Sequence, residues 1–184
     1  MRVLVVYESM YGNTHVVASN IADGLRAAHE VSLVPVADAT ADLVAEADLL
    51  VVGAPTHMHG LSTGSSRQAA RKAAARPETK LTLDPDAGGP ALRDWLSGLA
   101  DGHVLAAAFD TRMAGAPVLT GRASRGMSRL LRRHGCRLIT PPESFLVTKL
   151  NTLVDGESSR AREWGAALAA TAGQALPRRV AAGR

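Results

Sequence analysis

The chain has 184 residues, 46% of them hydrophobic, which is enough for one globular domain with a sizeable core. Its 21 basic and 17 acidic residues give a net charge of +4, and it has only two Trp, two Tyr and two Phe, so neither charge nor aromatic content indicates nucleic-acid binding. No stretch approaches about 20 apolar residues, which argues against a membrane span, and the single cysteine, Cys136, cannot form an internal disulfide and favours a cytoplasmic protein.

The first predicted element is a strand over residues 2–7, because its aliphatic run is too short for a helix. From Asn13 onward, apolar residues recur at helical spacing and predict an amphipathic helix. The loop between them, YESMYGNT over residues 7–14, therefore joins the carboxyl end of a strand to the amino end of a helix. Unpaired backbone N–H groups and the helix dipole favour an anion at such a junction, most often a phosphate, and Gly12 lets the backbone approach it closely.

This loop lacks the two common nucleotide-binding patterns. No Lys follows Gly12 in a G-x-x-x-x-G-K-[ST] motif, and no G-x-G-x-x-G is present, so neither a nucleotide triphosphatase nor a dinucleotide loop is predicted. A terminal phosphate monoester is the ligand that remains. The alternative is an ordinary strand-to-helix turn capped by Ser, Asn or Thr.

The next elements repeat the alternation of strand and helix. A strand over 31–36, a short helix over 38–45 and a buried strand over 48–53 predict a parallel sheet with right-handed crossovers. The loop GAPTHMHG, over residues 53–60, follows. With strand order 2-1-3-4-5 the binding crevice lies beyond the carboxyl ends of strands 1 and 3, so this loop and the one at 7–14 are predicted to be neighbours.

Together, S-x-x-G-N-T after the first strand and G-A-P-T-H-x-x-G after the third resemble the two flavin loops of the flavodoxin-like family. The first loop is especially similar to those of flavodoxin domains in quinone reductases and diflavin proteins. The resemblance covers most of the chain and implies a three-layer α/β fold, with a five-stranded parallel sheet of order 2-1-3-4-5 and helices on both faces. It implies FMN as the cofactor, with its phosphate held by Ser9, Met10, Tyr11, Gly12, Asn13 and Thr14.

The resemblance also implies that two further loops flank the flavin ring. The second loop supplies Pro55, Thr56, His57, Met58, His59 and Gly60. A strand over 104–109 leads into the third, which supplies Phe109, Asp110, Thr111 and Arg112. His57, His59 and Arg112 are the candidates for a catalytic role, because an imidazole can donate a proton and a guanidinium can stabilise negative charge. No metal site is predicted at the histidines, since no further ligand cluster stands out.

Residues 61–88 depart from a compact flavodoxin and are predicted to be an insertion in a domain spanning 1–176. An Ala- and Arg-rich helical segment over 65–76 is followed by a connector with little apolar periodicity. Two interpretations stay open: a solvated helix with a loose connector, or a lid or subunit contact beside the flavin. Because the segment has few large apolar residues, we expect it to be mobile and dispensable for the fold.

The remaining elements are predicted from their periodicity. They are helices over 90–100, 123–134 and 157–176 and a fifth strand over 137–139 and 143–148, interrupted by two prolines. Trp95 is expected in the core, Asp110 is expected to cap its own loop, and the arginines of the helix over 123–134 are interpreted as a solvated face. The basic tail over 177–184 is predicted to be disordered.

Three functions follow from these expectations. The first is an FMN-dependent oxidoreductase of the quinone reductase kind, which takes electrons from NAD(P)H or a reductase and passes them to a small acceptor such as a quinone. The second is a non-catalytic flavodoxin that carries electrons between protein partners. The third is an FMN-free relative that uses the same loops for another phosphate. The basic chain and Arg112 favour the first, and a homo-oligomer is left open.

Overall fold

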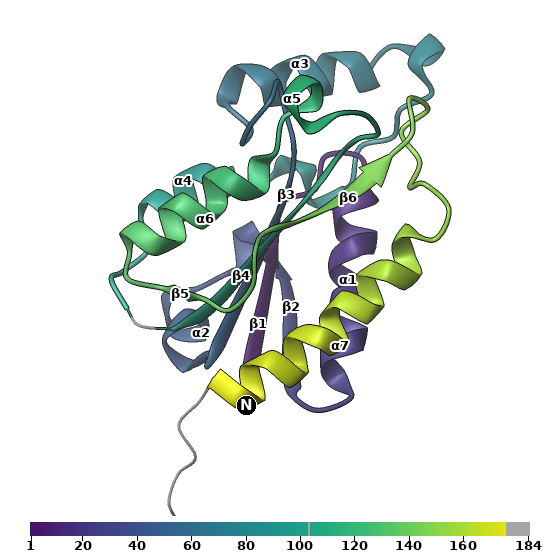
Figure 1. Ribbon diagram of the computed structural model, residues 1–184. Helices are drawn as coiled ribbons and strands as arrows, with labels where there is room; N and C mark the ends of the chain where they lie inside the picture. The colour runs from purple at the N-terminus through teal and green to yellow at the C-terminus, as the bar shows by residue number, and fades with distance from the viewer. Residues whose placement is uncertain (103, 176–184) are drawn as a thin grey trace, which may run out of the picture.

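The computed structural model describes residues 1–102 and 104–175 (Figure 1). One parallel sheet of six strands forms the centre: β1 (Arg2–Tyr7), β2 (Glu30–Pro35), β3 (Leu49–Pro55), β4 (Leu105–Met113), β5 (Arg137–Leu138) and β6 (Glu143–Val147). The order is β2-β1-β3-β4-β5. Both β5 and β6 pair with β4, β5 near its start and β6 along its second half, so together they fill the fifth position. The predicted fold class and strand order are confirmed.

Helices cover both faces of the sheet (Figure 1). On one face lie α1 (Asn13–Arg26) and α7 (Glu157–Ala175), and on the other α2 (Ala41–Glu46), α4 (Leu92–Ser97) and α6 (Ala123–Arg133). Alternate side chains of β1 point to opposite faces, so the strand contributes to both cores and is buried on both sides. No helix within the described residues combines the length and the apolar character needed to cross a membrane.

The remaining elements lie around the ends of the sheet. They are α3 (Gly64–Ala74), α5 (Pro117–Thr120) and three 3₁₀ turns, η1 (Val36–Asp38), η2 (Pro77–Thr79) and η3 (Pro85–Gly88). In Figure 1, α3 and α5 lie at the top, beyond the carboxyl ends of the strands. Trp95 donates from its indole N–H to the carbonyl of Ala39 at 2.9 Å and packs against the core, as expected. The tail predicted over 177–184 lies outside the described residues.

Strand β4 is longer than predicted. It runs to Met113 because β3 pairs with it as far as Thr111 and β6 pairs with it from Phe109 onward, so residues 110–112 are strand and not loop. The Phe109 ring packs edge-on against Phe145 and Trp164, with ring centroids 6.1 and 6.2 Å away. A side chain on Gly53 would overlap this ring, since a Cβ there would lie 2.0 Å from it. Gly53 is therefore required for the packing of the core.

Residues 61–88, which the sequence predicts to be mobile and dispensable for the fold, are joined to the end of β1 by buried hydrogen bonds. Glu8, just after β1, is only 4% exposed and accepts three hydrogen bonds: from the Ser62 hydroxyl at 2.7 Å, the Arg67 guanidinium at 2.5 Å and the Leu92 N–H at 2.8 Å. Arg67 also donates to the carbonyls of Ala87 and Gly89. The segment has few large apolar residues, but this buried polar network fixes it to the end of β1.

We predict that Arg67→Ala lowers the free energy of unfolding by about 3–5 kcal/mol, because it leaves the Glu8 carboxylate buried without its partner. Urea unfolding would measure the change. Lys72→Ala is the control, since Lys72 lies exposed on the same helix. Equal stabilities of the two variants would show that the Glu8–Arg67 pair does not stabilise the fold.

Deletion of residues 61–88 is expected to unfold the protein, because it removes Ser62 and Arg67 from the buried Glu8 carboxylate.

Candidate functional site

A cavity of about 510 Å³ lies beyond the carboxyl ends of the strands. Its size falls within the range of small-molecule sites, about 300–1,000 Å³. All three predicted loops contribute to its wall, through Met10, Tyr11, Asn13, Thr14, Pro55, Thr56, His57, Met58, Thr111 and Arg112. The structure therefore brings together side chains that lie about a hundred residues apart in sequence.

The first loop ends at Gly12, directly before α1. Gly12 has φ +91°, a backbone conformation that glycine adopts readily. Its N–H donates to the Ser9 hydroxyl at 3.1 Å, and no side chain caps the start of α1. The N–H groups of the first helical turn thus lack a side-chain acceptor and can bind an anion. Ser9 and Gly12 shape this turn and are not among the residues that line the cavity.

Two side chains of α1 connect its start to distant parts of the fold. The Thr14 hydroxyl lies 2.7 Å from that of Thr111 on β4, and the Asn13 amide donates to the Asn151 carbonyl at 3.0 Å. Sequence reasoning missed the segment after β6, which adds Val147, Thr148, Lys149 and Asn151 to the wall. The rule that ligands bind at the carboxyl ends of strands could have found it, because this segment follows the fifth strand position.

The second loop contains a tight turn over residues 57–60. The backbones of His57 and Gly60 exchange two hydrogen bonds, at 2.8 and 3.0 Å, and the two residues between them, Met58 and His59, have positive φ. His57 and Met58 line the cavity, whereas His59 and Gly60 line a separate groove. Burial lowers the pKa of His57; Glu8 opposes this shift and Arg67 adds to it.

Phe109 and Asp110 were predicted to flank the flavin, but neither lines the cavity. Phe109 points into the core on one face of β4, and Asp110 points to the other face. The Asp110 carboxylate accepts from the Ser124 N–H at 2.7 Å at the start of α6, so it does not cap its own loop. Burial raises its pKa, although the hydrogen bond from Ser124 opposes the rise. Both residues lie outside the cavity because they belong to β4, which continues through them.

Arg112 lies in the cavity wall and is only 9% exposed. One of its terminal nitrogens donates to the carbonyls of Met113 and Gly115 and to the Thr120 hydroxyl, at 2.9–3.3 Å. No carboxylate in the described part of the chain forms an ion pair with it. Lys149 is a second cation in the wall, and the lining includes no Asp or Glu. The cavity is therefore electropositive.

The insertion forms one wall of the cavity. Ser66, Ala69, Ala70 and Ala73 of α3, together with Leu81, face the space. The Tyr11 hydroxyl donates to the Ala70 carbonyl at 3.0 Å, which joins the first loop to α3. Of the two interpretations of this segment, the contacts favour a structure beside the ligand over a solvated helix.

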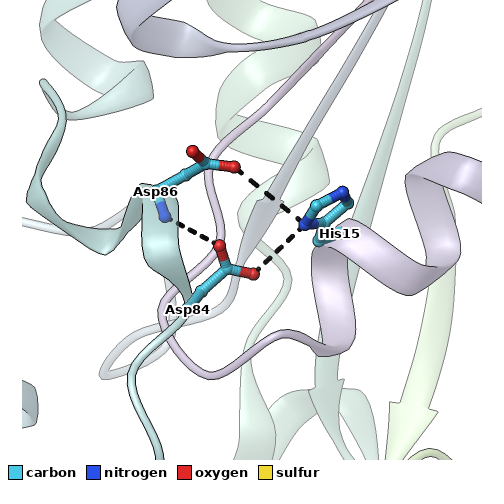
Figure 2. A group of neighbouring side chains, drawn as sticks. All are labelled: His15, Asp84 and Asp86. Carbon is cyan, nitrogen blue, oxygen red and sulfur yellow. Dashed lines mark hydrogen bonds and ion pairs between the residues drawn. The ribbon is translucent and has the colours of Figure 1, made fainter.

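His15, Asp84 and Asp86 form a cluster that sequence reasoning also missed (Figure 2). His15 Nδ1 lies 3.4 Å from Asp84 Oδ2 and 4.0 Å from Asp86 Oδ2. The Asp86 N–H donates to Asp84, and the Tyr7 hydroxyl donates to Asp86. Burial, with the neighbouring Asp86, raises the pKa of Tyr7. Each side chain has a protein partner, so the cluster is explained as a contact that holds η3 against α1.

The sequence model of the flavodoxin family matches residues 5–90, which include both loops that carried the resemblance. A search of curated proteins finds no match. Among solved structures, a flavodoxin from Archaea has a TM-score of 0.65 at 18% identity and covers 94% of this chain and 99% of its own. Flavodoxin 1 from Bacillus cereus has a TM-score of 0.63 at 19% identity, over 96% of this chain and 100% of its own. A WrbA-like flavodoxin from Agrobacterium tumefaciens gives 0.57 at 20% identity, over 94% and 98%.

Flavodoxins bind FMN, and the cavity has the properties that such a ligand needs. The uncapped start of α1, the neutral hydroxyl and amide groups around it and the lack of acidic groups in the wall fit a phosphate dianion. Pro55, Thr56 and Met58 offer surfaces of the kind that an aromatic ring can pack on. The chain therefore has a flavodoxin-like fold over nearly its whole length, and the sequence model of the flavodoxin family matches it over residues 5–90.

Proposed function

We propose that this protein is an electron carrier of the flavodoxin type, which uses FMN to pass electrons between protein partners. The observation that carries the proposal is the end-to-end correspondence with flavodoxins: the two quoted above cover 94% and 96% of this chain, and 99% and 100% of their own. FMN supplies the reversible redox chemistry when it is bound. The residues of the chain bind it, orient it and exclude water.

The proposed binding residues are those that line the cavity or shape its phosphate loop. Tyr11, Asn13 and Thr14 would hold the phosphate with the start of α1, and Ser9 and Gly12 would keep the loop in shape. The ring would lie against the second loop and the end of β4, at Pro55, Thr56, His57, Met58, Thr111 and Arg112. His59, Gly60, Phe109 and Asp110 are left out of this set, because they do not line the cavity.

A second candidate is an NAD(P)H-dependent oxidoreductase that reduces a small acceptor such as a quinone. The electropositive cavity favours it, because Arg112 and Lys149 would stabilise negative charge on reduced FMN. Such stabilisation raises the potential of the second electron and favours two-electron chemistry. Arg112 and His57 are then the candidates that could touch the reacting atoms.

We predict that Thr14→Glu weakens FMN binding by well over tenfold, because a carboxylate beside a phosphate dianion costs several kcal/mol. Fluorescence titration of the flavin-free protein with FMN would measure the affinity. Thr14→Val is the matched control, since it removes the hydroxyl without adding charge and should weaken binding much less. If both variants bind FMN equally, the phosphate does not lie at the start of α1.

We predict that Arg112→Ala lowers the potential of the second electron, whereas Arg112→Lys largely preserves it because the positive charge remains. Two unit charges about 4 Å apart interact by about 1–4 kcal/mol at dielectric constants of 80 to 20, which sets the scale of the change. An anaerobic reductive titration of the FMN-loaded proteins measures both potentials. Equal potentials in the Ala and Lys variants would show that the charge of Arg112 does not act on the flavin.

The two candidate functions are separated by a turnover assay on the FMN-loaded protein. A carrier is expected to show two well separated one-electron steps in the titration and no steady oxidation of NADH or NADPH when a small quinone is added. An enzyme is expected to take up both electrons nearly together and to oxidise the nucleotide continuously. Continuous turnover would overturn the carrier proposal in favour of the second candidate.

A further inference from the structure

A second hollow, of about 440 Å³, lies on the other side of the 57–60 turn from the flavin cavity. We call it the arginine groove, because Arg93, Arg122, Arg125 and Arg129 line it. Arg93 comes from α4, Arg122 directly precedes α6, and Arg125 and Arg129 belong to α6. No acidic residue is among the residues that line it. Three of these cations lie on or directly before α6, and Arg93 of α4 joins them around one concave surface.

Two of these guanidinium groups are held in place by the protein. Arg93 donates to the carbonyls of Ser62 and Leu61, at 3.0 and 2.8 Å. Arg122 donates to the Ser144 hydroxyl at 3.0 Å and to the Pro142 carbonyl at 3.1 Å. A guanidinium has five N–H donors, so each group keeps donors for a further partner. Groups positioned in this way lose little freedom when they bind a ligand.

The other two guanidinium groups have no partner within the described residues. Arg125 and Arg129 are exposed, and no hydrogen bond or ion pair of their side chains is found there. They lie one helical turn apart, a spacing at which like charges destabilise a helix. An anion between them would relieve this repulsion. The sequence indicated a solvated charged face. That interpretation explains why Arg125 and Arg129 are exposed, but not why they line one hollow together with Arg93 and Arg122.

We propose that the arginine groove binds a small anionic molecule that carries phosphate or carboxylate groups. Planar guanidinium groups bind both kinds of anion with paired hydrogen bonds. The volume of about 440 Å³ is that of a small-molecule site, about 300–1,000 Å³, which favours a small ligand over the surface of an acidic protein. The site is distinct from the FMN site, because His59 and Gly60 line the groove whereas His57 and Met58 line the flavin cavity.

Isothermal titration of the FMN-loaded protein with pyrophosphate tests the proposal, because bound FMN keeps the probe out of the phosphate loop. Arg125→Ala/Arg129→Ala is expected to weaken pyrophosphate binding at least tenfold. The matched control is Arg132→Ala/Arg162→Ala, which removes the same charge from exposed positions outside the groove and should change the affinity less than twofold. Thermal unfolding of both double variants checks that they are folded.

Three outcomes would overturn the proposal: no saturable binding, equal weakening in the two double variants, or binding only of an acidic peptide and not of pyrophosphate. The second outcome would mean that overall charge attracts the probe, and the third that the groove docks an acidic protein. The same titration on flavin-free protein makes the result independent of FMN. If the flavin-free protein binds one more pyrophosphate than the FMN-loaded protein, the additional site is the phosphate loop. The site in the arginine groove is then present in both forms.

Discussion

The buried contact between Glu8 and Arg67 determines how the parts around the cavity proposed for FMN fit together. Glu8 is the first residue after β1, and its carboxylate binds the Ser62 hydroxyl, the Arg67 guanidinium and the Leu92 N–H. A buried ion pair is tolerated only when its remaining donors and acceptors are satisfied, and here the carbonyls of residues 87 and 89 satisfy Arg67. One carboxylate thereby fixes the loop at residues 7–14, α3 and the start of α4 relative to one another.

The shape of the cavity follows from that contact. Once Arg67 is fixed, the alanine-rich side of α3 faces the cavity, and Tyr11 reaches the Ala70 carbonyl. The Asp84 N–H also donates to the Met10 carbonyl, so the insertion touches the phosphate loop a second time. The insertion thus forms part of the cavity wall, as the loops of the sheet do. If FMN binds here as proposed, the small side chains on α3 leave space for its planar ring.

The two hollows on either side of the 57–60 turn are both lined by cations. The flavin cavity has Arg112 and Lys149 in its wall, and the arginine groove has four arginines, while neither lining includes an acidic side chain. Burial lowers the pKa of His57, and the permanent cations in the cavity wall are Arg112 and Lys149. An anionic partner or ligand would meet favourable potential at both sites. The proposed carrier would therefore differ in its surface charge from an acidic electron carrier.

The sequence by itself determined the alternation of strands and helices and the two loops at residues 7–14 and 53–60, because short aliphatic runs, helical periodicity and Gly12 act over a few neighbouring residues. The order of the strands in the sheet was implied by the family resemblance. Only the tertiary structure decided which residues reach the cavity. Strand β4 extends through residues 110–112 because β6 pairs with it, which sends Phe109 into the core and Asp110 to α6. The residues next to Arg67 in the sequence give no sign that it is buried, because its partner Glu8 lies 59 residues away. The arginine groove likewise exists only where α4 and α6 pack side by side, and no local spacing records such a long-range contact.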